Sequence, residues 1–246
     1  MSKGQAVLLS SLFVSALTAC ADDQVVHSPP ETPAIGKDRA TVSGHVLDSN
    51  GAPVVGAAVQ VRGSGEHAIA ASDGAFVLDV PANTTLTLAA TAPGMSTTLL
   101  QQFLVSPAAT AAFEIPLLTT DRVKGLIAMG TNPAGGAIAI AMRSLSGASD
   151  AAAGATVELT PQNLGKVLYA PQRAGMPDPD PTMMSVVQGN APIAWAVGVQ
   201  PHVSIMQLTL QGAAQVAPPY AIDDVIWPGT FTVDAGALTL VTLFTP

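Results

Sequence analysis

The sequence predicts an all-β protein. Between residues 40 and 118, apolar and polar residues alternate over short runs, which is the period of a half-buried β-strand. Clusters of Gly, Pro, Asn and Asp separate about seven such runs at the spacing typical of β-sandwiches, and this region has no convincing apolar stripe of a helix. Apolar residues make up 48% of the 246 residues and charged residues 11%, so the chain can bury a core.

The first element along the chain is a leader that is followed directly by Cys20, the only cysteine. Lys3 precedes an apolar run, residues 6–16, which has the length of a signal-peptide core and is too short to span a bilayer. A leucine, two small residues and Cys20 then resemble the lipobox of bacterial lipoproteins, where the thiol is acylated before the leader is removed. An ordinary secretory leader cleaved after Ala19 is the alternative, and it would leave an exposed free thiol in an oxidising compartment. We therefore expect a signal peptide over residues 1–19 and lipidation of Cys20.

Residues 20–40 are rich in proline and acidic residues, and we expect a flexible linker there. The net charge of −8 disfavours nucleic acid as a partner and gives no electrostatic attraction to anionic lipid. Attachment to the membrane would then depend on the acyl chains. In lipoproteins of two-membrane bacteria, aspartate directly after the cysteine signals retention in the inner membrane. Ala21 follows Cys20 here, so the resemblance implies the outer membrane of the cell envelope.

Three segments carry a resemblance over the next region: SGHVLDSNGAPVVGAAVQV (43–61), ASDGAFVLDVP (71–81) and TLTLAATAPGM (85–95). They resemble the carboxypeptidase regulatory-like domain, a small Greek-key β-sandwich of the transthyretin-like (prealbumin-like) type. The resemblance implies such a sandwich over residues 41–118. It also implies an accessory role, because the family has no active site of its own.

The C-terminal half contains segments that parallel the first. Residues 154–159 match residues 56–61, and residues 195–212 echo residues 76–94. A short match of this kind can also arise in any alanine-rich β protein. We expect a second, diverged β-sandwich over residues 122–246, with an insertion at 170–190. The nearest candidate for a membrane span, residues 125–142, is interrupted by TNPAGG and is not expected to cross a membrane.

No catalytic motif is present in the sequence. There is no nucleophile elbow, P-loop or HExxH motif, and the four histidines are far apart in the sequence: His27, His45, His67 and His202. Intradiol dioxygenases, which share this type of sandwich, hold iron with two Tyr and two His, and no closely spaced pair of histidines occurs here. Hydroxyisourate hydrolases end in Tyr-Arg-Gly-Ser, whereas this sequence ends in Leu-Phe-Thr-Pro. We expect no enzyme activity and no cofactor, with an accessory or degenerate hydrolase-type enzyme as the rival interpretation.

Acidic pairs raise the question of a calcium site. Asp178 and Asp180 lie in the stiff segment PDPDP, and oxygen pairs also occur at Asp48 with Asn50 and at Asp223 with Asp224. Calcium takes six to eight oxygen ligands, so one pair of carboxylates falls well short. We expect solvated acidic loops and no metal site.

All four Tyr and Trp residues lie in the second half of the chain. Such side chains pack cores and also form platforms for sugars or proteins. Trp195 lies in a strand-like run and is expected in the core. The candidate ligand surface is Tyr169, Tyr220 and Trp227, with Trp227 in loop-like sequence. The predicted function is a lipid-anchored envelope protein with a non-catalytic binding or structural role toward an envelope protein or a surface glycan. A carbohydrate-binding module is an alternative.

Overall fold

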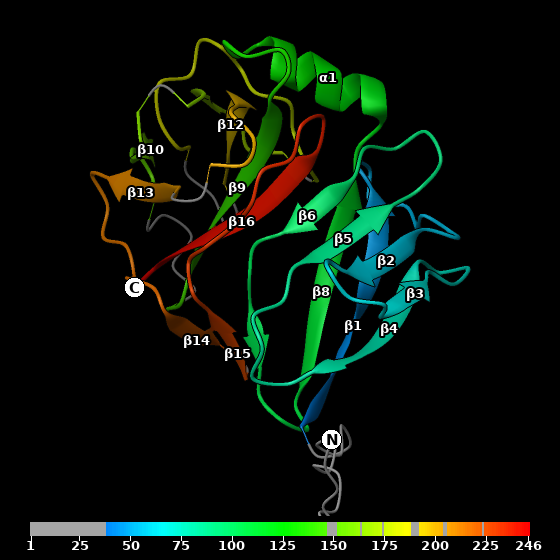
Figure 1. Cartoon of the computed structure of the whole chain (residues 1–246). Helices are drawn as coiled ribbons and strands as arrows, with labels where there is room; N and C mark the ends of the chain where they lie inside the picture. The colour runs from blue at the N-terminus through cyan, green and yellow to red at the C-terminus, as the bar shows by residue number, and fades with distance from the viewer. Residues whose placement is uncertain are drawn as a thin grey trace, which may run out of the picture. The chain divides into compact units, whose positions relative to one another are not determined.

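The computed structural model describes residues 38–146, 152–162, 164–173, 175–187, 192–203, 206–222 and 224–246. The leader, Cys20, His27 and nearly all of the linker lie outside these residues. Residues 35–246 form one compact unit. Its described part consists of sixteen strands and a single helix, which confirms the predicted all-β class (Figure 1).

The first half of this unit is a sandwich of two sheets. One sheet has the order β4-β1-β8, and the strands of the other follow the order β6-β5-β2-β3. Val42, Phe76 and Leu88 are among the buried side chains that fill the space between the sheets. The strands are β1 (Arg39–Asp48), β2 (Ala58–Val61), β3 (His67–Ile69), β4 (Ala75–Pro81), β5 (Leu88–Thr91), β6 (Thr98–Leu100), β7 (Leu104–Val105) and β8 (Thr110–Leu117).

The turns predicted in this half are formed by local side-chain bonds. The Asp48 carboxylate accepts hydrogen bonds from the backbone N–H of Asn50 at 2.8 Å and of Ala52 at 2.9 Å. At the next turn, the Asp73 carboxylate accepts from the Ala75 N–H at 3.0 Å, and Gly74 has a φ of +77°. A side chain at Gly74 would place its Cβ 2.6 Å from the Val46 carbonyl oxygen, so both the backbone angle and the close approach require glycine.

The second half repeats the strand pairings of the first. β9 lies between an antiparallel β12 and a parallel β16, as β1 lies between an antiparallel β4 and a parallel β8. β10 pairs antiparallel with β13, as β2 does with β5. This is the second sandwich that the sequence predicts. Its strands are β9 (Gly136–Ser144), β10 (Thr156–Thr160), β11 (Lys166–Tyr169), β12 (Ile193–Val199), β13 (Gln207–Gln211), β14 (Tyr220–Ile222), β15 (Val225–Trp227) and β16 (Leu238–Thr245).

The two halves share one sheet, which is a feature that the sequence did not indicate. Eight strands follow the order β11-β12-β9-β16-β6-β5-β2-β3, with β16 parallel to both β9 and β6 (Figure 1). A small sheet, β14-β15-β7, also joins segments from both halves. The Arg62 guanidinium donates to Thr232 at 3.1 Å and to Asp234 at 3.0 Å across the same boundary. The domain bounds proposed from the sequence stay a prediction.

The helix α1 (Thr120–Ala128) was not predicted. The Thr119 hydroxyl caps it by accepting from the Arg122 N–H at 3.3 Å, and Asp121 lies in its first turn. Val123, Leu126 and Ile127 have the i, i+3, i+4 spacing of a helical face and are buried with Trp195 against β9 and β12. In the described part of the chain, no helix reaches the length and hydropathy needed to cross a bilayer.

Candidate functional site

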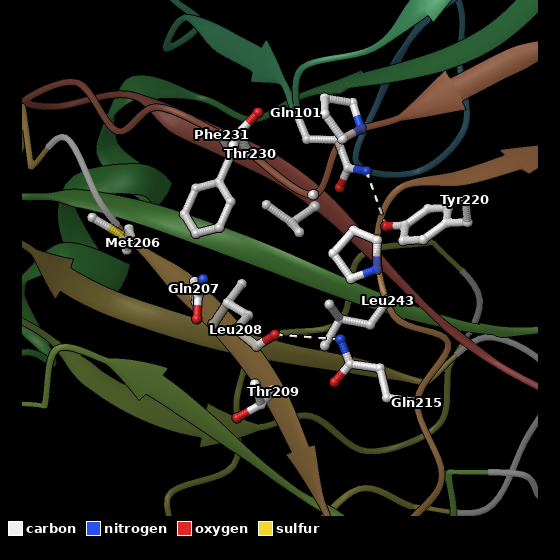
Figure 2. Close-up of a pocket in the computed structure, with 14 residues that line it drawn as sticks. Gln101, Met206, Gln207, Leu208, Thr209, Gln215, Tyr220, Thr230, Phe231 and Leu243 are labelled. Atoms are coloured by element: carbon white, nitrogen blue, oxygen red, sulfur yellow. Dashed lines mark hydrogen bonds between the residues drawn. The ribbon is translucent and has the colours of Figure 1, made fainter.

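A cavity of about 330 Å³ opens beside β13 and β16 in the second half of the unit (Figure 2). Its remaining walls come from the segment that leads into β14, the segment that follows β15, and Gln101 at the end of β6. The lining residues are Gln101, Met206, Gln207, Leu208, Thr209, Gln215, Pro218, Tyr220, Pro228, Gly229, Thr230, Phe231, Val241 and Leu243.

One wall is a buried network around Gln101, which is only 2% exposed. Its side-chain oxygen accepts a hydrogen bond from the Thr242 N–H at 2.6 Å, and its side-chain nitrogen lies 3.5 Å from the Tyr220 hydroxyl. That hydroxyl donates to the Thr242 carbonyl at 2.9 Å. Burial raises the pKa of Tyr220 against the opposing effect of the Gln101 bond, so the phenol is neutral at physiological pH. The network therefore presents uncharged polar groups in a fixed geometry.

The opposite wall is β13, and the Gln215 side chain lies along it. The Gln215 amide oxygen accepts from the Leu210 N–H at 2.8 Å. Its amide nitrogen donates to the Leu208 carbonyl at 3.4 Å, and Figure 2 shows this second bond. One side-chain amide thus bonds to a carbonyl and an N–H of the same strand. This is what the backbone of a neighbouring strand does.

The third wall is the segment from Pro228 to Phe231. Gly229 has a φ of +78°, and a Cβ there would lie 2.6 Å from the Pro218 ring, so glycine lets these two segments approach each other. Thr230 bonds to Gln102 twice: its carbonyl accepts from the Gln102 N–H at 2.9 Å, and its hydroxyl donates to the Gln102 side-chain oxygen. The cavity is thus held between elements that are fixed by hydrogen bonds.

Of the three aromatic residues predicted as a ligand surface, the structure brings only Tyr220 to the cavity. Tyr169 is buried at the end of β11, where its hydroxyl accepts from the Val157 N–H at 2.9 Å. Trp227 lies at the end of β15 and not in a loop. It is half-buried, with ring centroids 6.0 Å from Phe103 and 5.9 Å from Phe113, because it extends the core of the first sandwich. Trp195 is fully buried, as predicted.

Sequence reasoning missed Gln101 and Gln215. For Gln101 a signal exists: the amides Gln101 and Gln102 interrupt the strand-like apolar run TTLLQQFLV. An amide inside such a run must find hydrogen-bond partners when it is buried, and this requirement can mark a polar network. Nothing comparable marks Gln215, because a glutamine in a loop is ordinary.

The acidic residues considered for calcium have other partners. Asp178 accepts from the Arg122 guanidinium at 2.8 Å, and Asp180 accepts from the Thr182 N–H at 2.9 Å and its hydroxyl at 2.7 Å. The Thr182 bonds hold the pKa of Asp180 below its usual value. The carboxylate of Asp48 belongs to its turn, and Asp223 lies outside the described residues. Among the described residues, no three His, Cys, Asp or Glu side chains gather closely enough to hold a metal ion.

The described part of the 170–190 insertion is fastened to α1 and β12. Besides its bond to Asp178, Arg122 donates to the Met176 carbonyl, and the Trp195 indole N–H donates to the Pro177 carbonyl at 3.0 Å. None of these residues lines the cavity.

The first sandwich has the strands, turns and core expected of the resembling family, and comparison with family models agrees. Residues 41–118 match the model of the carboxypeptidase regulatory-like domain. This part of the chain is a carboxypeptidase regulatory-like domain. The cavity lies outside it except for Gln101, which the domain contributes. A search of the curated proteins gave no match.

Solved structures that are similar to this chain cover between 32% and 85% of it. A type II cohesin–X-dockerin complex from Acetivibrio cellulolyticus is 22% identical over 32% of this chain and 58% of its own, with a TM-score of 0.28. The dioxygenase domain of a dioxygenase–carbohydrate-binding fusion from Streptomyces sp. SirexAA-E is 18% identical over 36% of this chain and 84% of its own, with a TM-score of 0.28. The shaft pilin SpaA from Lactobacillus rhamnosus GG is 9% identical over 85% of this chain and 98% of its own, with a TM-score of 0.25. The chain thus spans less than two thirds of the cohesin–dockerin chain.

Proposed function

We propose that this protein is a lipid-anchored, non-catalytic binding protein of the bacterial cell envelope. In this proposal the carboxypeptidase regulatory-like domain is an accessory module that supports the second sandwich. The observation that carries the binding role is the cavity beside β13, whose described lining residues offer amide, hydroxyl and backbone groups and include no side chain that is charged at neutral pH. Such a cavity is suited to an uncharged ligand held by hydrogen bonds.

The groups at the cavity favour binding over catalysis. A hydroxyl nucleophile needs a general base within hydrogen-bond reach, and among the lining residues that the structure describes there is no His, Asp, Glu or Lys. The Thr230 hydroxyl is used by Gln102, and burial raises the pKa of the Tyr220 phenol. This arrangement supports a binding role over the rival hydrolase-type interpretation.

The anchor in this proposal is the acylated thiol of Cys20, followed by the proline-rich linker. With a net charge of −8, the protein gains nothing from anionic lipid, and two or more acyl chains give a lasting hold. The outer membrane is the expected location, because alanine follows the cysteine.

The anchor is tested by growing bacteria that express the chain in labelled palmitate. We expect label in the wild-type protein, which fractionates with the outer membrane, and none in C20A, which is released. An unlabelled wild-type protein would refute the anchor. Mass spectrometry of the N-terminal peptide identifies the acyl groups directly.

The binding role is tested with purified C20A protein against panels of peptidase substrates, esterase substrates and soluble glycans. Turnover would refute the non-catalytic role and support the hydrolase-type enzyme. Retention on a glycan would favour the carbohydrate-binding module. We do not expect the latter, because Tyr220 and Phe231, the aromatic residues at the cavity, are both buried and offer no open ring face for stacking.

A further inference from the structure

In the part of the chain that the structure describes, one edge of β13 faces the cavity without a partner strand. In an antiparallel pair, the N–H and C=O of alternate residues point toward the partner strand. The Val157 N–H of β10 bonds to the Tyr169 hydroxyl, so Val157 and its partner Leu210 do not exchange backbone hydrogen bonds. The backbone groups of Leu208 and Leu210 therefore point away from β10. The bonds from these two residues to Gln215, at the cavity, agree with this direction.

The internal repeat shows what belongs at this edge. In the first half, β5 pairs with β2 on one side and with β6 on the other, through Ala89 with Leu99 and Ala90 with Thr98. β13 corresponds to β5, yet the sheet β10-β13 has two strands in the described part of the chain. Residues 212–219, which follow β13 as the β6 region follows β5, are all described and form no strand. β14, the next strand along the chain, pairs with β15 and not with β13, so in the described part of the chain no strand takes the place of β6 beside β13.

The Gln215 side chain takes a small part of that missing position. Its carboxamide has the same donor and acceptor as a peptide group, and it satisfies one N–H and one C=O of the β13 edge. Among the described residues, no hydrogen bond is made by the Leu208 N–H or the Leu210 carbonyl. These two groups are available to an incoming backbone.

We propose that the cavity receives an extended, uncharged peptide segment of a partner protein, which pairs with β13 as a third strand. This inference rests on the proposed binding function and names its ligand class. Binding of this type gains affinity from main-chain hydrogen bonds and specificity from pockets for alternate side chains. The uncharged lining is compatible with the backbone of an incoming segment and favours a segment whose side chains are uncharged. A volume of about 330 Å³ lies at the lower end for ligand pockets, so the cavity takes a few residues of the segment.

The other walls agree with a strand that pairs on one side only. Pro218 and Pro228 also line the cavity and have no N–H to donate. The Gln101 side-chain nitrogen has two donors, of which one is used in a long contact of 3.5 Å to Tyr220. Its second donor can bond to a carbonyl of the incoming segment.

The chain itself supplies the probe for a test. The blocked peptide STTLLQQ has the sequence of residues 96–102, which contains β6, the strand that occupies the corresponding position in the first half. We expect this peptide to bind purified, isotope-labelled C20A protein. The amide signals of Leu208 and Leu210 should shift, and hydrogen exchange of the Leu208 N–H should slow at least tenfold. The control peptide STTPLQQ, in which proline removes a central donor, should bind at least tenfold more weakly.

Two matched variants separate an edge-pairing role of Gln215 from a purely structural one. Q215A frees the Leu208 carbonyl and the Leu210 N–H, so it should bind STTLLQQ several-fold more tightly. Q211A alters a glutamine of the same strand that bonds to Glu158 outside the cavity, and it should leave peptide affinity unchanged. A gain in affinity is not expected from a variant that only loosens the fold.

Three results would overturn the inference. The first is the absence of shifts at Leu208 and Leu210 with millimolar peptide in both the wild-type and the Q215A backgrounds. The second is binding of a soluble glycan at these amides, which would leave the proposed binding function intact. The third is pairing of β13 with a second copy of this chain, seen as a dimer in light scattering that protects the Leu208 N–H. Failure of palmitate labelling, in contrast, would refute the anchor and leave this inference untouched.

Discussion

The replacement of Gln101 by leucine tests whether the buried amide network holds the two halves together at the cavity. Gln101 is 2% exposed, and its oxygen accepts from the N–H of Thr242 in β16 at 2.6 Å. Leucine conserves most of the volume and leaves that N–H without an acceptor. An unsatisfied buried donor costs about 1–3 kcal/mol. The contact to Tyr220, at 3.5 Å, is too long to add much. We expect the free energy of unfolding to fall by about 2 kcal/mol.

Urea denaturation measures this change in the free energy of unfolding directly. For a unit of this size, the expected loss corresponds to a fall in Tm of about 4–8 °C. The matched control is Q102L. Gln102 is the next residue, is half-buried, and accepts from the Thr230 hydroxyl close to the surface. We expect it to cost less than about 1 kcal/mol. Equal losses for the two variants, or a Q101L protein within about 0.5 kcal/mol of wild type, would refute the role given to Gln101.

Three further predictions concern the insertion, the pH dependence and the shared sheet. R122A should cost about 1 kcal/mol, because the Asp178 side of its ion pair is largely exposed, and hydrogen exchange near Met176 should accelerate relative to the control K124A. Burial raises the pKa of Tyr220 in the folded state, so the stability that its neutral phenol contributes is fully present below about pH 10. That stability is lost as the pH rises further. Y220F should therefore lose less stability than the wild type in alkaline denaturation curves. A fragment of residues 38–118 loses the partner strands of β6 and β7. Its unfolding transition, followed by circular dichroism, should be broad or have a Tm far below that of the whole unit. An equal Tm would contradict the importance of the shared sheet.

Features that depend on neighbouring residues could be predicted from the sequence. The turns at Asp48 and at Asp73–Gly74 follow from short-range bonds and backbone angles, and the structure confirms both. The alternating strands of the carboxypeptidase regulatory-like domain follow from burial of one face. α1 was missed because its apolar face holds only three residues over nine positions, which is a weak signal beside a long alanine-rich run.

Features that depend on distant pairing could not be predicted in this way. β16 is a mostly apolar run that could belong to any buried strand, and its residues do not indicate that its parallel neighbours come from both halves. The cavity is a consequence of that pairing, because Gln101 reaches Thr242 only after β6 and β16 lie side by side. Of the predicted aromatic surface, Tyr220 lies at the cavity, while Tyr169 and Trp227 pack in the two separate cores.

The position of β16 between β6 and β9 also has a consequence for how the molecule folds. Thr98 meets Leu238 in this sheet, so the regulatory-like domain cannot complete its own edge until a segment near the other end of the described chain has docked. Contacts between such remote segments form slowly, because a long loop must close first. Until β16 has docked, β6 therefore keeps one edge unpaired, and an unpaired apolar edge of this kind makes a partly folded chain prone to aggregate.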